Sequence, residues 1–333
     1  MPPSWEDLPV HFKQDVVRNL NFESRCCFRK CSHAERQLVD EVPLVLDKVN
    51  LEIEEDGMML RVGNTAFSYS LDGNENRITV TVVKNSDGDD DNDEPLVKEK
   101  HLHHVQHNML DLIMTDFFLL FINGKSVVRK MEIIVRQCQA EEKYTVYETL
   151  RRKLQAMQPD YCINTKKVEY YLSAFEDTIH SLRLLNENYL ETIAINTFTK
   201  KIVNSAMESV FETKQWKMAK HVQITNVVNI PIRFFTHLHS YNADLLELYL
   251  NDLLMSVQSF YEIDAPINSH FQLHYHNTLD TTSVSNSIAI NFKNTSVSGN
   301  VVNIPMRSGN SNLAVKFLNN RILGHVQSLL KKN

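Results

Sequence analysis

Residues 8–20 read LPVHFKQDVVRNL, and this stretch decides how the N-terminal part of the chain is interpreted. Phe12, Val16 and Leu20 recur at the spacing of one face of an α-helix, and Val17 lies beside them. A helix this short cannot cover so large an apolar face by itself. Another part of this chain, or another protein, is therefore expected to cover it.

Two more short helices are expected after the first one. Asp7 is the expected N-cap of the first helix, and Pro9 lies in its first turn, where a missing N–H costs nothing. Ser32 is the expected N-cap of the third helix, with Glu35 at the capping-box position. Three helices within about 40 residues bury too little surface to be stable alone. They predict a docking module over residues 1–45.

The composition is that of a globular protein. The chain has 333 residues, of which 43% are hydrophobic and 23% charged. The net charge of −6 argues against general nucleic-acid binding, which needs a basic surface. No apolar run is long enough to span a bilayer, and the N-terminus does not resemble a signal peptide. The five cysteines form no CxxC pair and are expected to be reduced thiols, so a cytoplasmic or nuclear location is predicted.

Catalytic, cofactor and metal sites are not expected. Of the eight glycines, none lies between Gly124 and Gly299, and the sequence contains no phosphate-binding loop or nucleophile elbow. His103 and His107 are spaced like residues on one helix face, but no cysteine or carboxylate completes a metal site. We therefore predict no enzymatic activity, no cofactor and no metal.

The next segments are expected to be a small sheet and a linker. Residues 46–84 alternate between apolar and polar side chains and contain Asp-Gly and Gly-Asn turn signals. This pattern predicts an antiparallel β-meander of about four strands. The run KNSDGDDDNDEP follows and has no apolar residue, so residues 85–103 are expected to form an acidic loop or linker.

Helical and strand-like segments alternate over residues 104–285. Helices are expected at 104–122, 145–157, 200–212 and 244–257, and strand-like runs begin at residues 130, 166, 191, 219 and 270. Because strands recur about every 20–40 residues, a repeated βα unit with parallel strands is predicted. This gives a mixed α+β and α/β fold class with a solenoid-like repeat domain, although no leucine-rich consensus with an asparagine ladder is visible.

The remaining residues, 286–333, are expected to add strands and a closing helix. The stretch SIAINFKN at 287–294 is predicted to begin these strands, followed by VVNIPMR and LAVKFLNN. The stretch ILGHVQSLLKK at 322–332 is predicted to be a helix.

Two stretches resemble known domains. LPVHFKQDVVRNL is similar to the first helix of the F-box, and the resemblance runs from Leu8 to Val39. It departs at Glu35, where the F-box often has an aromatic residue. KQWKMAKHVQIT at 214–225 resembles the QWK-x-AK landmark of the FTH domain of nematode F-box proteins, and this second resemblance covers about residues 110–285. The order of the two domains is the one found in that family.

The resemblance implies a substrate-recognition adaptor of an SCF-type cullin-RING ubiquitin ligase. The F-box would dock on the Skp-type linker subunit, and the C-terminal domain would bind an unknown protein target, with no membrane or nucleic-acid partner. The alternative is an adaptor outside a ligase, such as a cofactor of a translational repressor, that uses the F-box only for docking. The implied linker-binding residues are Leu8, Pro9, Phe12, Val16, Val17, Leu20 and Phe22.

The target-binding surface is expected on the strands of the repeat domain. Side chains alternate between the two faces of a strand, so polar residues between apolar ones point out of the core. Loops, or the β-meander near residue 70, are the alternative. The exposed positions chosen in this way are Glu169, Gln223, Gln272 and His274.

Overall fold

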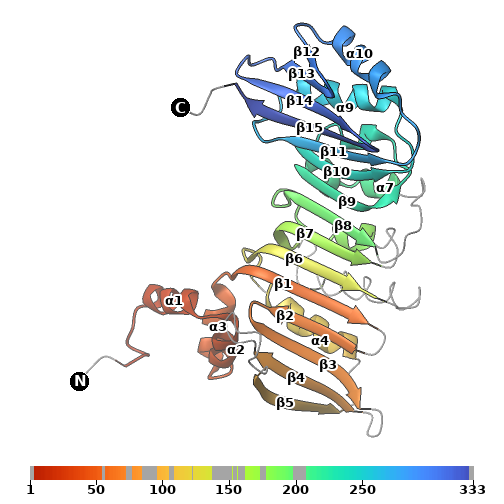
Figure 1. Ribbon diagram of the computed structural model, residues 1–333. Helices are drawn as coiled ribbons and strands as arrows, with labels where there is room; N and C mark the ends of the chain where they lie inside the picture. Colours follow the sequence, from red (N-terminus) through yellow and green to blue (C-terminus); the bar gives the residue numbers. More distant parts are fainter. Residues whose placement is uncertain are drawn as a thin grey trace. The chain divides into compact units, whose positions relative to one another are not determined.

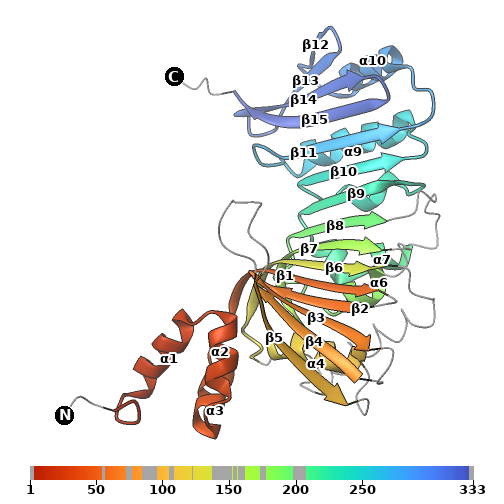
Figure 2. The ribbon, with the colours of Figure 1, turned by 60° about the horizontal axis from the view of Figure 1, so that its bottom comes forward.

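A computed structural model describes most of the chain: residues 4–54, 57–72, 77–84, 96–104, 109–121, 123–136, 152, 156, 162–172, 178–197 and 208–329. It divides into two compact units (Figures 1 and 2). The first comprises residues 1–171 and 180–190, and the second comprises residues 172–179 and 191–333. The predicted mixture of helices and strands is confirmed in both units.

The first unit begins with the three predicted helices, α1 (Val10–Asn19), α2 (Phe22–Arg29) and α3 (His33–Glu41). The predicted cap of α1 is wrong. Pro9 is the N-cap residue, and the Asp7 carboxylate instead accepts hydrogen bonds from the Ser4 backbone N–H at 3.0 Å and from the Ser4 hydroxyl at 2.6 Å. The predicted cap of α3 is confirmed, since the Ser32 hydroxyl accepts hydrogen bonds from the N–H groups of Ala34 and Glu35.

The sheet of the first unit contains the predicted meander. Strands β1 (Val45–Glu54), β2 (Gly57–Val62), β3 (Thr65–Asp72), β4 (Arg77–Lys84) and β5 (Leu96–His104) pair antiparallel in chain order. β6 (Val127–Val135) pairs parallel with β1, and β7 (Asn164–Leu172) lies beside β6. The expected linker over 85–103 needs correction: residues 96–104 form strand β5, because their backbone pairs with β4. Residues 85–95 lie outside the described residues.

Helix α4 (Met109–Leu119) packs on β2 and β3 and supplies the core of the first unit. Ile113, Met114 and Phe117 are fully buried. The helix predicted over 104–122 begins later than expected because His104 still belongs to strand β5. Short helix α6 (Thr178–Leu182) lies at the boundary of the two units. The helix predicted over 145–157 falls almost wholly outside the described residues.

The second unit starts with four parallel strands, β8 (Thr192–Thr197), β9 (His221–Val228), β10 (Ser240–Leu245) and β11 (His270–Tyr275). The sheet continues with the antiparallel strands β15 (Arg321–Ser328), β14 (Ser311–Leu318), β13 (Val301–Pro305) and β12 (Ser296–Ser298). The helices between them are α7 (Glu208–Phe211), α8 (Lys214–Met218), the 3₁₀ turn η3 (Ile232–Phe235), α9 (Leu250–Glu262) and α10 (Thr281–Asn291).

Aromatic side chains between the helices and the parallel strands form the core of the second unit. The Trp216 ring in α8 lies 5.9 Å from that of Phe235, which lies 5.3 Å from that of Tyr241 in β10. The Tyr241 ring in turn stacks on Phe271 in β11. The Trp216 indole N–H donates a hydrogen bond to the carbonyl of Phe234 at 2.9 Å. The tryptophan of the QWK motif is therefore a core residue.

Three predictions for the second unit are wrong. Strand β10 was not foreseen, and the helix predicted from residue 244 begins at Leu250 because residues 244–245 complete that strand. The stretch 287–294, predicted as a strand, lies largely in α10, because the Asp280 carboxylate caps that helix and Val284 and Ile288 pack one turn apart into the core. The predicted closing helix is strand β15, whose alternate residues are buried. No helix in the described part of the chain is long and apolar enough to cross a membrane.

Candidate docking interface

The three-helix module has a small core of its own. Val17 of α1 packs with Leu38 and Val39 of α3 and with Val42 just after α3, and all four side chains are buried. Trp5 and Phe28 pack against this cluster. Val17 is the residue of α1 in this cluster, so the other apolar residues of the helix are not covered by the core of the module.

Trp5 packs against the edge of the core of the module. Its ring meets Phe28 edge to face at 5.3 Å, and its indole N–H donates a hydrogen bond to the Glu35 carboxylate at 3.1 Å. A hydrogen bond from the Ser32 hydroxyl, together with the one from Trp5, lowers the pKa of the Glu35 carboxyl. Glu35, where the sequence departs from the F-box pattern, therefore holds an aromatic residue instead of supplying one.

Helix α1 carries an exposed apolar stripe. Val10 is 61% exposed, Phe12 53% and Val16 36%. With Val17 and Leu20 these residues lie within about half of the helix circumference at 100° per residue. Three large apolar side chains exposed on one short helix are unusual for a surface that faces only water.

The structure separates the predicted linker-binding residues into two groups. Pro9, Phe12 and Val16 are exposed, and Leu8 and Leu20 are half-buried beside them. Val17 is fully buried in the core of the module, so its side chain does not reach a partner. The ring of Phe22 lies 6.1 Å from Phe67 of β3 and points toward the sheet.

Arg25 fastens α2 to the chain that leaves α3. Its buried guanidinium donates hydrogen bonds to the carbonyls of Leu20 at 3.3 Å, Val42 at 2.9 Å and Pro43 at 3.3 Å. Burial lowers the pKa of Arg25. A buried cation with three backbone acceptors is costly to disturb, so this residue fixes the module internally.

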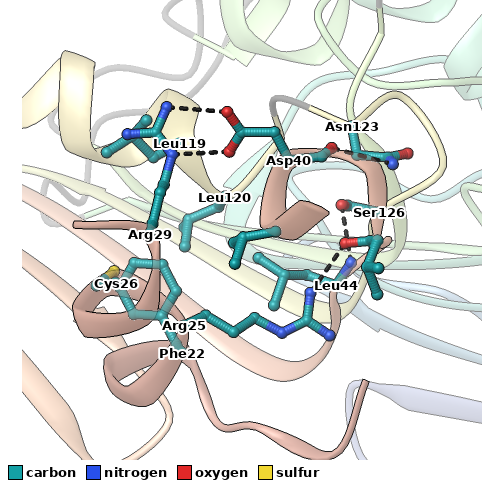
Figure 3. Close-up of a pocket in the computed structure, with 12 residues that line it drawn as sticks. Phe22, Arg25, Cys26, Arg29, Asp40, Leu44, Leu119, Leu120, Asn123 and Ser126 are labelled. Carbon is teal, nitrogen blue, oxygen red and sulfur yellow. Dashed lines mark hydrogen bonds and ion pairs between the residues drawn. The ribbon is translucent and has the colours of Figure 1, made fainter. Parts of the chain in front are cut away.

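Hydrogen bonds also attach the module to the sheet of the first unit (Figure 3). Within the module, Arg29 of α2 and Asp40 of α3 form a bidentate ion pair at 2.7 and 3.1 Å. The Asn123 side-chain amide donates hydrogen bonds to the carbonyls of Asp40 at 3.3 Å and Glu41 at 2.6 Å, and the Leu44 N–H donates one to the Ser126 hydroxyl at 3.0 Å. The cavity between them has a volume of about 30 Å³, room for about two waters, so this junction is a joint and not a ligand site.

Asparagines continue the attachment into the sheet, a feature that the sequence reading missed. The Asn164 amide donates hydrogen bonds to the carbonyls of Gly124 at 2.9 Å and Ser126 at 3.2 Å. The Asn186 amide donates one to the Asn164 side-chain oxygen at 2.8 Å. The signal available in the sequence was an asparagine a few residues before each of the strand-like runs at 130, 166 and 191, without the leucine spacing that usually accompanies such a ladder.

The predicted target-binding residues belong to two different units and are described separately. Glu169, in the first unit, is nine-tenths buried and paired with Lys130 at 2.8 Å and Lys167 at 2.6 Å. Burial acts to raise its pKa, but the hydrogen bonds from Lys130 and Lys167 outweigh burial and lower it. In the second unit Gln223 is exposed, while Gln272 and His274 are half-buried and hydrogen-bonded to each other at 2.8 Å.

His103 and His107, whose spacing is that of residues on one helix face, are not seen together on a helix. His103 lies in strand β5 and not on a helix, and His107 is outside the described residues. Among the residues that the structure describes, no group of His, Cys, Asp or Glu is arranged to hold a metal ion.

Comparison with known proteins identifies both domains. Residues 5–47 match the model of the F-box domain, and residues 145–262 match that of the FTH domain. The chain is 24% identical over 258 residues to F-box A protein 224 of Caenorhabditis elegans, an alignment that covers 76% of this chain and 62% of that protein. No solved structure matches the chain. The chain therefore carries a match to the F-box domain followed by a match to the FTH domain, the combination predicted from its sequence, and it is similar to a nematode F-box protein.

Proposed function

We propose that this protein is a substrate-recognition adaptor of an SCF-type cullin-RING ubiquitin ligase. The exposed apolar stripe of α1 carries the proposal. It lies inside the matched F-box, and Phe12 and Val16 present apolar surface that the module's own core does not use. The partner that fits this stripe is a Skp-type linker subunit with a complementary apolar groove. The adaptor performs no chemistry and acts by raising the local concentration of its target near the ligase.

The attachment of the module supports the same role. Arg25, Arg29 and Asn123 hold the helices to each other and to the sheet, so a linker bound to α1 is held in a fixed position on the first unit. An adaptor that presents a target benefits from such a joint, because a loose one would lower the effective concentration of the reacting groups.

The target would be bound by the FTH region. We propose that its parallel strands form a degenerate, solenoid-like repeat, in which β8 to β11 are successive strands of one ladder. Repeats of this kind bind partners on one extended surface. Gln223, Gln272 and His274 lie on the face of that ladder opposite the aromatic core, and Glu169 is the weakest of the four candidates because ion pairs already occupy it.

The docking half is tested by measuring affinity for a purified Skp-type linker. Truncating one apolar anchor typically costs about 2 kcal/mol, so Phe12→Ala with Val16→Ala should weaken binding by about a thousandfold. His11→Ala, exposed on the other side of α1, is the matched control and should bind as the unmodified protein does. Equal affinity of the folded double variant and the control would refute the docking surface.

The ligase assignment needs a second measurement. Co-purification of the unmodified protein with a cullin, lost in the Phe12→Ala, Val16→Ala variant, is the expected result. Linker binding without any cullin would instead favour the adaptor that works outside a ligase.

A further inference from the structure

Histidines gather at one end of the strands in the second unit. His221 is the first residue of β9, and His270 is the first residue of β11. Ser240 of β10 lies between them as the register partner of both, and His325 of β15 lies directly opposite His270. Strands β9, β10, β11 and β15 are neighbours in the sheet (Figure 1). By the register of these strands, three imidazoles with one small side chain among them therefore form a row across the four strands.

This histidine row (His221, His270 and His325) lies on the face of the sheet away from the aromatic core. The next residue in each strand points the other way: Val222, Phe271 and Val326 are buried. Phe271 packs against Phe260 of helix α9, which identifies the buried face as the helix-covered one. His270 is exposed, and His221 and His325 are half-buried.

Basic side chains surround the histidine row. The His239 ring lies 6.3 Å from that of His221, and Lys220 precedes His221 in the chain. Burial lowers the pKa of His221, and His239, His270 and Lys220 lower it further, while Glu191 acts in the opposite direction. The Glu191 carboxylate is itself paired with Lys220 at 3.2 Å. Protonation of the row therefore adds cations that repel one another until an anion arrives.

Metal binding does not explain the row, because the described residues include no His, Cys, Asp or Glu group arranged to hold an ion. The nitrogens are also only partly used within the protein. His221 Nδ1 lies 2.6 Å from the Ser240 hydroxyl, and His270 Nδ1 lies 3.2 Å from the Asn268 carbonyl. What the row offers to a ligand is imidazole N–H groups and, below neutral pH, positive charge.

We propose that the histidine row binds an extended acidic segment of the target protein, rich in Asp and Glu, and binds it more tightly as the pH falls. The row crosses four strands and so spans about 14 Å at about 4.8 Å per strand interval. Same-side carboxylates of an extended peptide recur about every 6.7 Å, so two or three of them fit along the row. A single phosphate would reach only part of it. The inference rests on the proposed role of this face in target binding and names the chemistry of the target.

The test uses the full-length chain and a fluorescein-labelled peptide of alternating Asp and Glu, with an Asn and Gln peptide of the same length as the uncharged probe. Fluorescence anisotropy should show at least tenfold tighter binding of the acidic peptide at about pH 5.5 than at about pH 7.5, because histidines gain protons in this range while carboxylates keep their charge. The uncharged peptide should not bind at either pH. Acidic-peptide affinity that does not change with pH would overturn the proposal.

Variants locate the binding. His270→Gln with His325→Gln keeps polar side chains but removes two of the three imidazoles, and should weaken binding at about pH 5.5 by about tenfold and reduce its pH dependence. His276→Gln is the matched control, since His276 is exposed just after β11 and pairs with Asp244 at 2.9 Å, outside the row. Circular dichroism at the assay pH checks that each variant is folded. If the double variant unfolds, the single variant His270→Gln is tested in its place. An equal loss in the control would refute the assignment to the row.

Two further outcomes separate the alternatives. A phosphoserine peptide should bind less tightly than the acidic peptide, and its affinity should stop rising near pH 6, where phosphate loses its second charge. Tighter binding of the phosphopeptide would overturn the assignment to carboxylates. Linker binding through α1 does not involve the row, so loss of linker binding contradicts the proposed function, while failure of the acidic peptide alone contradicts only this inference.

Discussion

Gly324 of strand β15 is the glycine that the fold can least replace. A Cβ built at this position would lie 2.1 Å from Cε1 and 2.4 Å from Cζ of Phe271, far inside van der Waals contact. The ring cannot move aside, because it stacks on Tyr241 with centroids 5.9 Å apart and meets Phe260 at 5.2 Å. Overpacking of a filled core typically costs 1–3 kcal/mol or more, and we expect Gly324→Ala to lower the free energy of unfolding by about 3 kcal/mol.

The second unit can be followed by itself because Trp216 is one of only two tryptophans in the chain. In a Trp5→Phe background, urea unfolding monitored by tryptophan fluorescence reports the surroundings of Trp216. Phe271→Ala alone should cost about 3–5 kcal/mol through the cavity it leaves. In the double variant Gly324→Ala, Phe271→Ala, the new methyl group of residue 324 lies in the cavity left by the Phe271 ring. Adding Gly324→Ala to Phe271→Ala should therefore cause almost no further loss of unfolding free energy.

Two results would refute this reasoning. The first is a Gly324→Ala protein within about 0.5 kcal/mol of its parent, since a change that small is typical of a surface site. The second is simple additivity of the two changes, because residues in direct contact should show a coupling energy well above about 0.5 kcal/mol. Gly309→Ala, also in the second unit, is the matched control: its Cβ would meet nothing within 4 Å, and only its positive φ of 72° opposes the change, so about 1 kcal/mol is expected.

Three further predictions concern other parts of the chain. Arg25→Met should lower the thermal midpoint of the F-box module, measured by Trp5 fluorescence, because three backbone carbonyls, one of them in a buried hydrogen bond, lose their donor; an unchanged midpoint would contradict this. Burial lowers the pKa of His237, so the unfolded state takes up its proton first, and stability to urea should be constant above about pH 6.5 and fall below it. His237→Gln should reduce that fall, and an unchanged acid profile would exclude His237 as its source. Deleting residues 86–93 should leave the melting temperature nearly unchanged, since loop length has a small effect on stability, and a large drop would show that the acidic run is structural.

The elements that the sequence predicted correctly are those with a strong local pattern. The helices of the F-box follow from apolar spacing and from the Ser32 cap, and the meander follows from alternation and Asp-Gly turns. Strands β6, β7, β8, β9 and β11 coincide with the strand-like runs expected from the sequence, although burial is not strictly alternate: Met131 to Val135 of β6 are all buried.

The elements that were missed depend on contacts made far along the chain. The residues of α10, rich in Ser, Thr, Val and Ile, have weak helix propensity, and the helix forms because Asp280 caps it and Ile288 packs into the core. Strand β15 contains a glycine, and in the sequence it is followed by Leu-Leu-Lys-Lys, a run that suggests a helix, but pairing of residues 321–328 with β14 and β11 makes them a strand. Local propensity was overridden in both cases by packing that no short window contains.

The candidate site was predicted in part for the same reason. Apolar spacing identifies the residues of α1 that face away from the helix's polar side, but it does not distinguish Phe12, which is exposed, from Val17, which the module buries. That distinction needs the position of α3, whose Leu38 and Val39 cover Val17. The alternation of side chains along β7 wrongly predicts that Glu169 is exposed. Lys130 on the neighbouring strand pairs with its carboxylate and helps to bury it.

The junction between the F-box module and the sheet shows what these long-range contacts achieve together. The hydrogen bonds from Asn123 to Asp40 and Glu41, and from Leu44 to Ser126, join residues that are 82 or 83 positions apart. Each satisfies a backbone group that the end of α3 or the start of β1 would otherwise leave without a partner, so weakening the joint would expose polar groups as well as break contacts. The buried Arg25 is held by the same turn of chain. We therefore expect the exposed stripe of α1 to move together with the sheet of the first unit, so that the proposed partner on α1 would be oriented by the whole unit and not by a flexible arm.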